Sequence, residues 1–221
     1  HPVINNSLHL DKLYDITRLG RTITLELSSK TEIWDNYTSK NRNMIRKSKK
    51  SGVEIYWGRN VQLFNEFEML YKRTMDNANA EDYYYFEKEF YDSILYDLKY
   101  NSMIFYAVYE KKIIAMSIIL HYNRQLHYHL SASDRDYGNL GATNLLLHEV
   151  AYWGYENNFK TLHLGGGLGN KEDSLFSFKK SFNKNSNTYY SIGKKIFNKK
   201  IYDKLVEIKK EVDSNNINEI F

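Results

Sequence analysis

The spacing of hydrophobic residues in the first half of the chain predicts helices separated by short strands. Thr22 to Leu27 alternates between polar and apolar residues, as a half-buried strand does. Ser29 and Glu32 form a capping-box pattern that opens a helix, and this helix ends at Gly52. The further predicted elements are a strand over 53–57, a helix from a cap at Asn60 through Met75, and a helix over 86–100.

From about residue 103 the apolar spacing changes from a helical period to a period of two. The predicted elements are strands over 103–109, 113–121 and 125–132, a helix over 142–157, a strand over 161–164, a helix after residue 173, a strand over 188–193 and a terminal helix over 198–213. A strand meander followed by alternating helices and strands is typical of an α+β fold. We expect a mixed, mostly antiparallel sheet flanked by helices.

Three consecutive glycines, Gly165, Gly166 and Gly167, separate a short apolar strand from the helix that follows. Glycine in such a place indicates a backbone angle that other residues resist, or a ligand or chain that passes too close for a Cβ. Asp173 or Ser174 can cap the helix, whose orphan N–H groups then face the glycine turn. The glycines and Asp173 are therefore candidates for binding substrate.

The same helix has an apolar face with a lysine at its edge. At about 100° per residue, Leu175, Phe178 and Phe182 share one face. Lys179 borders this face, whereas Lys180 points to the opposite side, into solvent. A lysine beside a buried stripe and a bare backbone turn can neutralise negative charge on a ligand. Lys179 is therefore a candidate catalytic residue, and Phe178 is a candidate substrate contact.

The composition narrows the class of protein. The chain has 221 residues, 42% of them hydrophobic, which suffices for one domain or one and a half with a substantial core. Cys is absent, which excludes disulfides, thiolate zinc sites and a cysteine nucleophile and fits a cytoplasmic protein. No apolar run approaches the roughly 20 residues of a membrane span, so we expect no membrane insertion. The chain is rich in Asn, Ile and Tyr, a bias that is expected of an AT-rich genome and that also raises the number of lysines. The net charge of +4 therefore says little about function, and only local clusters of charge are informative.

One such cluster covers the last turns of the helix that ends at Gly52. Arg42 and Arg46 share one face there, within a segment, 40–50, that also contains four lysines. Cations at a helix C-terminus are favourable for the helix dipole alone. Arg also matches phosphate oxygens, which favours a clamp on a nucleotide-linked substrate or an RNA backbone. Both interpretations stay open, with Arg42 and Arg46 as candidate substrate-binding residues.

A histidine-rich strand over 125–132 supplies further candidates. Its polar residues His127, His129 and Ser131 alternate with apolar ones, which predicts that the polar set faces a cleft or solvent. His129 is suited to act as a general base near pH 7, although a hydrogen-bonded structural histidine is the commoner role. The spacing provides no metal triad, so no metal is expected.

Two loops that precede predicted helices supply the remaining candidate site residues. The loop over 135–142 carries Gly138 and Gly141 and leads into a helix N-terminus, where anions bind readily. A plain turn explains this loop equally well. The aromatic run at 83–86 can form a stacking wall, with Tyr85 as a candidate substrate contact, or serve only in packing.

In this order, the motifs resemble those of the FemAB family of peptidoglycan-bridge aminoacyltransferases and their GNAT-like relatives. The matching segments are Lys40 to Val53, Leu70 to Met75 with the tyrosine run, His129 to Ser133 with Gly141 to Leu146, and Leu164 to Lys179. In the GNAT acetyltransferases, the loop analogous to 135–142 holds the pyrophosphate of coenzyme A. Here that loop has one residue more between its glycines.

The resemblance implies an acetyltransferase-like fold and transfer of an acyl or aminoacyl group to an amine, without a metal or a tightly bound cofactor. It implies a donor that is either an aminoacyl-tRNA or an acyl-coenzyme A, and a nucleotide- or lipid-linked cell-envelope precursor as acceptor. Lys179 would stabilise the oxyanion of the ester carbonyl, and Arg42 and Arg46 would meet a diphosphate. Gly138 and Gly141 would contact coenzyme A if that were the donor.

We expect three parts along the chain. Residues 1–21 are predicted as an N-terminal lead or the remnant of a missing first half, 22–197 as the GNAT-like acyltransferase domain, and 198–221 as a C-terminal helix and tail. The start without Met and the short lead predict a piece of a longer protein with two such domains. Two other functions stay open: an acyl-coenzyme A-dependent N-acyltransferase for an amino sugar, and a non-catalytic module that binds RNA or a nucleotide-sugar.

Overall fold

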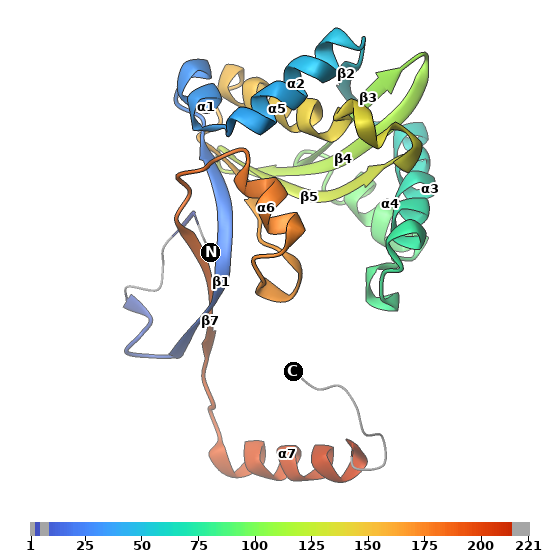
Figure 1. Ribbon diagram of the computed structural model, residues 1–221. Coiled ribbons are helices and arrows are strands. Elements are labelled where there is room, and N and C mark those ends of the chain that lie inside the picture. The colour runs from blue at the N-terminus through green and yellow to red at the C-terminus, as the bar shows by residue number, and fades with distance from the viewer. Residues whose placement is uncertain (1–2, 5–8, 214–221) are drawn as a thin grey trace.

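The structure, a computed structural model, describes residues 3–4 and 9–213, and within them seven strands form one sheet (Figure 1). The strands are β1 (Asp15–Glu26), β2 (Glu54–Gly58), β3 (Ser102–Tyr109), β4 (Lys112–Tyr122), β5 (Gln125–Ser133), β6 (Thr161–Gly165) and β7 (Thr188–Lys194). They lie in the order β2-β3-β4-β5-β6-β1-β7, and every neighbouring pair is antiparallel except β5 and β6. The predicted mixed, mostly antiparallel sheet is confirmed.

Helices cover both faces of this sheet (Figure 1). The helices are α1 (Lys30–Asn36), α2 (Ser39–Lys50), α3 (Val61–Ala78), α4 (Lys88–Tyr96), α5 (Ala142–Glu156), α6 (Ser174–Lys180) and α7 (Lys199–Asp213). One hydrophobic cluster lies between the sheet and α1, α2 and α5. A second cluster lies on the other face, under α3 and α4. The fold therefore has three layers, with the sheet in the middle.

The helix predicted from Ser29 to Gly52 is two helices. Tyr37 is extended, with φ −68° and ψ 147°, and the side chain of Thr38 caps α2 by accepting a hydrogen bond from the Asn41 N–H. Arg42 donates a hydrogen bond of 2.7 Å to the Tyr37 carbonyl oxygen, which closes the end of α1. The apolar spacing continues through the break, so it does not reveal a Thr that caps rather than continues a helix.

β1 begins at Asp15, seven residues before the predicted strand. Its first part pairs with β7, with Asp15 opposite Lys194, and its last part pairs with β6, with Glu26 opposite Thr161. Residues 15–21 thus belong to the sheet, across the predicted boundary at residue 21. The division into three parts stays a prediction. The ends on which it partly depends, 1–2, 5–8 and 214–221, lie outside the described residues.

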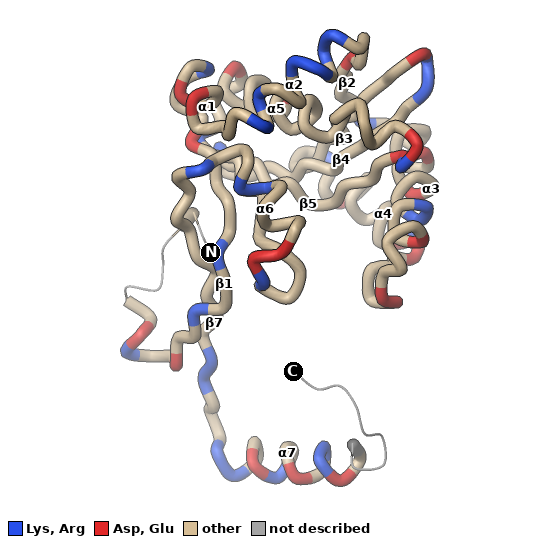
Figure 2. Tube along the Cα trace, in the orientation of Figure 1, with Lys and Arg blue, Asp and Glu red and all other residues tan. Residues whose placement is uncertain are grey.

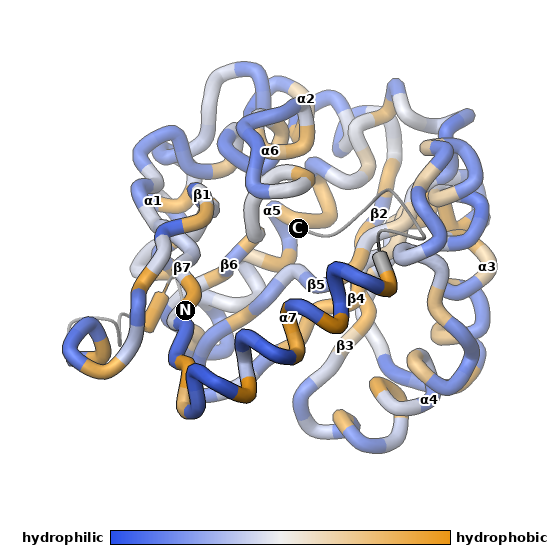
Figure 3. Tube along the Cα trace, turned by 90° about the horizontal axis from the view of Figure 1, so that it is seen from below, coloured by the Kyte–Doolittle hydropathy of each residue, from blue (hydrophilic) through white to orange (hydrophobic). Residues whose placement is uncertain are grey.

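α7 follows β7 and stands away from the sheet (Figure 1). Hydrophobic and hydrophilic residues alternate along it (Figure 3). It carries exposed apolar residues at helical spacing: Ile201, Leu205, Ile208 and Val212. Among the helices that the structure describes, none is long and apolar enough to cross a membrane.

Candidate active site

The parallel pair of β5 and β6 opens into a V near the middle of the sheet. The pairing runs from Gln125 opposite Thr161 to His127 opposite His163 and ends there. Beyond this point β5 continues beside β4, and β6 continues beside β1. The two strands therefore diverge, and the space between their ends is open to side chains from other elements.

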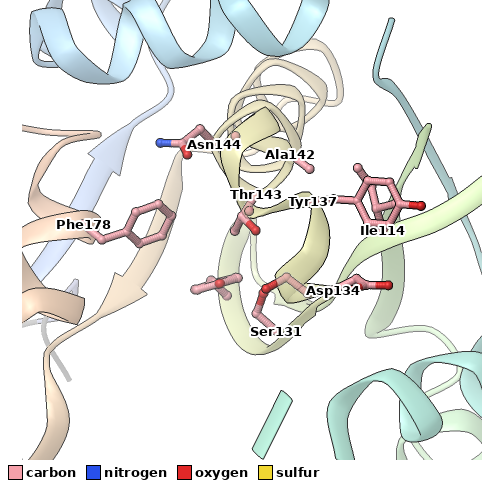
Figure 4. A pocket seen from close by; sticks show the side chains of 12 residues that line it. Ile114, Ser131, Asp134, Tyr137, Ala142, Thr143, Asn144 and Phe178 are labelled. Atoms are coloured by element: carbon pink, nitrogen blue, oxygen red, sulfur yellow. The ribbon is translucent and has the colours of Figure 1, made fainter. Parts of the chain in front are cut away.

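A cavity of about 300 Å³ lies at this opening (Figure 4). Its walls come from β4, β5, the 3-10 turn η3 (Arg135–Leu140), the first turn of α5, and α6. The lining residues are Ile114, Tyr128, Ser131, Ser133, Asp134, Tyr137, Gly138, Gly141, Ala142, Thr143, Asn144 and Phe178. Four predicted site residues are thus brought together: Ser131, Gly138, Gly141 and Phe178.

A β-bulge at His129 decides which face each residue of β5 occupies. Ile118 on β4 pairs with Leu130, and Ile119 pairs with Tyr128, so His129 is the extra residue between them. Such a bulge shifts the alternation of side chains between the two faces of a sheet by one position.

The bulge overturns the predicted alternation along β5. Tyr128 and Ser131 line the cavity, whereas the His129 ring lies 6.1 Å from that of Phe90 in α4, on the other face. The prediction that His129 and Ser131 face the same side is wrong, because a period-two argument cannot anticipate an unpaired residue. Burial also lowers the pKa of His129 below its ordinary 6.5, so its imidazole is neutral at pH 7.

Three hydroxyl groups lie together here: those of Tyr128 and Ser131, which line the cavity, and that of the buried Ser117 behind them. The Ser131 Oγ lies 3.1 Å from the Ser117 Oγ of β4. Burial raises the pKa of Tyr128, while hydrogen bonds from Ser131 and Ser117 to its oxygen oppose the increase. The Tyr128 hydroxyl therefore keeps its proton at neutral pH and can act as a neutral hydrogen-bond donor.

Lys179 of α6 lies outside the cavity lining and beside Tyr128, which belongs to it. Its Nζ donates a hydrogen bond of 2.7 Å to the carbonyl oxygen of Gly166 and lies 5.9 Å from the centre of the Tyr128 ring. The side chain is half-buried, and burial lowers the pKa of Lys179 to about 8, while the carboxylate of Asp173 opposes the decrease. At pH 7 the group is an ammonium whose hydrogen-bond partner is a neutral carbonyl. Such a cation is available to stabilise negative charge that develops on a ligand.

The position of Lys179 follows from the cap of its helix. Asp173 caps α6 by accepting a hydrogen bond of 2.8 Å from the Phe176 N–H, and its second oxygen accepts one of 3.0 Å from the Leu168 N–H. Phe176 and Phe182 are the buried residues of this segment, and Phe178 is half-buried at the cavity. The predicted apolar stripe missed Phe176, because α6 packs against β1 behind as well as bordering the cavity in front.

The packing of the chain itself accounts for the three glycines. Gly165 has a φ of +78°, which favours glycine. A Cβ at Gly166 would lie 2.8 Å from the carbonyl oxygen of Arg21 on β1, and one at Gly167 would collide with the Lys171 carbonyl oxygen and a carboxylate oxygen of Asp173. The glycines thus permit a tight loop that directs the Gly166 carbonyl at Lys179. Their contact with substrate stays a prediction.

The turn η3 forms the mouth of the cavity. Gly141 has a φ of +68°, and a Cβ there would lie 3.2 Å from Cε of Met44 in α2. A Cβ at Gly138 would meet no atom of the described chain within 4 Å, so this glycine borders open space. Lys47 Nζ donates a hydrogen bond of 2.7 Å to the Asn139 carbonyl oxygen, which ties η3 to α2.

The remaining predicted residues lie away from the cavity lining. Arg42 is bound to the end of α1, and the Arg46 guanidinium lies 5.2 Å from the centre of the Trp34 ring. Tyr85, on the α3 and α4 face, donates a hydrogen bond of 3.0 Å to an Asp76 carboxylate oxygen. Their contacts with substrate stay predictions.

The predicted site residues left out most of the cavity lining, including Tyr128, Tyr137, Thr143 and Asn144. Figure 4 shows Thr143 and Asn144 on the side of the cavity that Phe178 faces. Asn144 is fixed by a hydrogen bond of 2.8 Å to the Asn41 side chain. Thr143 and Asn144 could have been identified from their position shortly after Gly141, because a helix that follows a glycine-containing loop presents its first turn to a ligand.

The model of the acetyltransferase (GNAT) domain family matches residues 39–179 of the chain. This chain belongs to the GNAT acetyltransferase family. It is also 27% identical, over 177 residues, to the UDP-N-acetylmuramoylpentapeptide-lysine N(6)-alanyltransferase of Weissella viridescens. The aligned part is 78% of this chain and 51% of that enzyme. The chain therefore spans about half the length of this curated relative.

Solved structures establish the fold independently. FemX has a TM-score of 0.70 at 12% identity, and the match covers 91% of this chain and 71% of FemX. The C-terminal domain of a putative lysylphosphatidylglycerol synthetase from Agrobacterium fabrum has a TM-score of 0.64 at 14% identity, with coverage of 94% and 69%. L-PGS from Bacillus licheniformis has a TM-score of 0.60 at 14% identity, with coverage of 94% and 70%. The predicted resemblance to FemAB-like acyltransferases with a GNAT-like fold is confirmed.

Proposed function

We propose that the chain transfers an activated aminoacyl or acyl group to an amine of a cell-wall or surface-polysaccharide precursor. The observation that carries this proposal is the Lys179 ammonium, held by the Gly166 carbonyl at the opening between β5 and β6. A half-buried cation without a carboxylate in its hydrogen bond suits the oxyanion of an acyl transfer.

The reaction requires positioning of two substrates, removal of a proton and stabilisation of charge on oxygen. The amine nitrogen forms a bond with the donor carbonyl carbon, and the carbonyl oxygen becomes an oxyanion that accepts a hydrogen bond from Lys179. The carbon–oxygen bond of the ester then breaks, the nitrogen loses a proton, and the leaving hydroxyl gains one. A single oxyanion donor is worth about 3–4 kcal/mol in comparable reactions.

Two residues near this centre, Asp134 and His129, carry groups that can accept a proton, and they differ in their access to it. Asp134 lines the cavity, and Lys112 donates a hydrogen bond of 3.0 Å to it, which lowers the pKa of the Asp134 carboxyl. His129 lies on the α3 and α4 face of the sheet. It can therefore accept a proton only from an amine that approaches from that side.

For the donor we propose an aminoacyl-tRNA, and for the acceptor a nucleotide- or lipid-linked cell-envelope precursor in the cytoplasm. The similarity to an alanyltransferase named for the lysine of a UDP-N-acetylmuramoyl pentapeptide supports this choice. The chemistry requires no tightly bound cofactor, because the carbonyl is already activated as an ester.

An acyl-coenzyme A donor is the second candidate, and the family match favours it. We place it second because of η3. The Gly141 N–H there donates to the Gly138 carbonyl oxygen at 3.4 Å, so it is directed at the chain rather than at a pyrophosphate.

A transfer assay with both donors tests the proposal. Labelled alanyl-tRNA or labelled acetyl-coenzyme A is mixed with a UDP-linked muramoyl pentapeptide, and label is measured on the peptide. We expect label to pass from alanyl-tRNA to the peptide, and we expect this transfer to depend on Lys179. Label from acetyl-coenzyme A alone would favour the second candidate, and RNA binding without any transfer would favour a non-catalytic module.

A further inference from the structure

A groove on the outer face of the molecule, between α1, α2 and α5, is separate from the cavity. It encloses about 410 Å³, within the range of small-molecule sites. Aromatic rings and cations line it together: Trp34, His148 and Tyr152, with Lys30, Arg46 and Lys49. None of these six residues lines the cavity at the β5 and β6 opening.

The aromatic rings form a continuous row. The ring centroids of Trp34 and His148 are 5.4 Å apart, and those of His148 and Tyr152 are 4.1 Å apart. His148 is buried, and burial lowers its pKa to about 3, with a smaller decrease from Lys49 and Lys30, so the ring is neutral. Trp34 and Tyr152 are half-buried and reach the groove from α1 and α5. The rings are inclined to one another by 62° and 56°, and cations lie over two of them, Arg46 over Trp34 and Lys30 over Tyr152. A planar base can stack on these two rings when the cations move to its phosphate.

The cations of the groove are held weakly. The Arg46 guanidinium lies 5.2 Å from the centre of the Trp34 ring and donates a hydrogen bond of 3.1 Å to the Asn43 side-chain oxygen. Lys49 pairs with Glu149 at 2.8 Å, and Lys30 pairs with Glu156. Exposed ion pairs of this kind contribute little to stability. A phosphate can therefore compete for these groups without a large cost.

We propose that this groove binds one nucleotide of a single-stranded RNA segment, with the base on the Trp34 and Tyr152 rings and the phosphate on Arg46 and Lys49. The inference rests on the proposed function, because the segment is then the end of the charged tRNA. A base stacked on an aromatic ring and a phosphate bound by Arg are the two contacts that such segments make with proteins.

The position of α2 favours an RNA strand over a free nucleotide. Arg46 and Lys49 face the groove on one flank of α2, whereas Lys47 bonds Asn139 of η3 at the cavity mouth on the other. At about 100° per residue, Lys50 lies between Arg46 and Lys47 around the axis of α2. This helix contains no acidic residue. Figure 2 shows this positive charge along α2. A helix with its side chains is about 10–12 Å across, so a strand that passes over α2 covers that distance with a few nucleotides. The donor ester can thus lie in the cavity while a base a few nucleotides away lies in the groove.

The test is fluorescence anisotropy with a fluorescein-labelled single-stranded RNA octamer on the full chain. We expect Trp34→Leu to weaken binding by roughly 5- to 100-fold at an unchanged salt dependence, and Trp34→Phe to weaken it less than about threefold, because Phe keeps a stacking face. Arg46→Gln is expected to weaken binding and to lower the slope of log K against log salt by about 0.7. Lys204→Gln on α7, which removes the same charge elsewhere, should change neither quantity beyond the error.

Three outcomes overturn the inference. The first is that the wild-type chain does not bind the octamer. The second is that Trp34→Leu and Arg46→Gln bind it as Lys204→Gln does. The third is that uridine monophosphate displaces the octamer at equal molar affinity, because a free nucleotide of the acceptor would then be the occupant. Failure of the proposed function gives a different result, since the chain would bind the octamer through the groove and yet transfer nothing from alanyl-tRNA.

Discussion

The ammonium of Lys179 donates a hydrogen bond of 2.7 Å to the carbonyl oxygen of Gly166. This contact joins the glycine turn after β6 to the helix that follows it. Gly166 has no room for a side chain, since a Cβ would lie 2.8 Å from the Arg21 carbonyl oxygen. The turn must therefore be glycine to place the carbonyl, and the carbonyl in turn positions the ammonium at the β5 and β6 opening.

The first prediction concerns the pH dependence of transfer. Burial lowers the pKa of Lys179 from 10.5 to about 8, and the protonated form is the active one in our mechanism. The wild-type rate divided by the rate of Lys179→Arg isolates this titration, because deprotonation of the acceptor amine affects both proteins alike. Arg keeps its proton over this range, so the ratio should fall as the pH rises through about 8. A ratio that stays constant from pH 7 to 9.5 would argue against a role for the ammonium.

The second prediction compares two glycines in thermal unfolding. Gly166→Ala should destabilise the protein by about 1–3 kcal/mol, because the new Cβ meets the backbone of β1 at 2.8 Å. Gly138→Ala should change stability by less than about 0.5 kcal/mol, since a Cβ there meets no described atom within 4 Å. Equal melting temperatures for the two variants would show that the glycine turn is not packed as the structure has it.

The local signals in the sequence predicted the elements well. Asn60 caps α3, accepting a hydrogen bond of 2.8 Å from the Leu63 N–H, and Asp173 caps α6, each as its residue type indicates. The strands of the meander appear where the period of two places them. A cap and an alternation depend on a few neighbouring residues, which is why the sequence reveals them.

The features that build the site depend on distant pairings. The bulge at His129 arises because the register between β4 and β5 shifts there. No residue type near His129 indicates this shift. The environment of Lys179 depends on the divergence of β5 from β6 and on Arg21 of β1, far away along the chain. The sequence could thus identify Lys179 as a candidate and could not place Tyr128 beside it.

The third prediction is a loss of stability in mild acid. Burial lowers the pKa of His148 to about 3 and that of His127 to about 4. The unfolded chain binds protons on these residues below pH 6.5, whereas the folded chain does not. Their contribution to stability is therefore complete above pH 6.5 and is lost as the pH falls toward 4, by about 2 kcal/mol per residue at pH 5.

Urea unfolding at pH 7.5 and pH 5.0 measures this loss. His148→Gln removes one titrating group, so the difference in unfolding free energy between the two pH values should shrink by about 2 kcal/mol. His9→Gln, which replaces an exposed histidine, is the matched control and should leave the difference unchanged. An unchanged difference in both variants would contradict the buried, neutral state of His148.

The fourth prediction is that acetyl-coenzyme A binds weakly or not at all. The extra residue of η3 directs the Gly141 N–H at the Gly138 carbonyl oxygen, which removes a donor from any pyrophosphate cradle. Isothermal titration calorimetry measures the affinity. A micromolar dissociation constant that Gly138→Leu abolishes would favour acyl-coenzyme A as the donor, because residue 138 lines the cavity and a Cβ there meets no described atom within 4 Å.

The catalytic role of Lys179 is measured most directly by the single-turnover rate of transfer from alanyl-tRNA in Lys179→Met and Lys180→Met. Met keeps the volume of the lysine stem, and both residues lie at the C-terminal end of α6, so each variant should fold. We predict that Lys179→Met lowers the rate by roughly tenfold to a thousandfold, because the oxyanion loses its donor. Lys180→Met should retain the wild-type rate within about twofold. Equal rates in the two variants would contradict the catalytic role of Lys179.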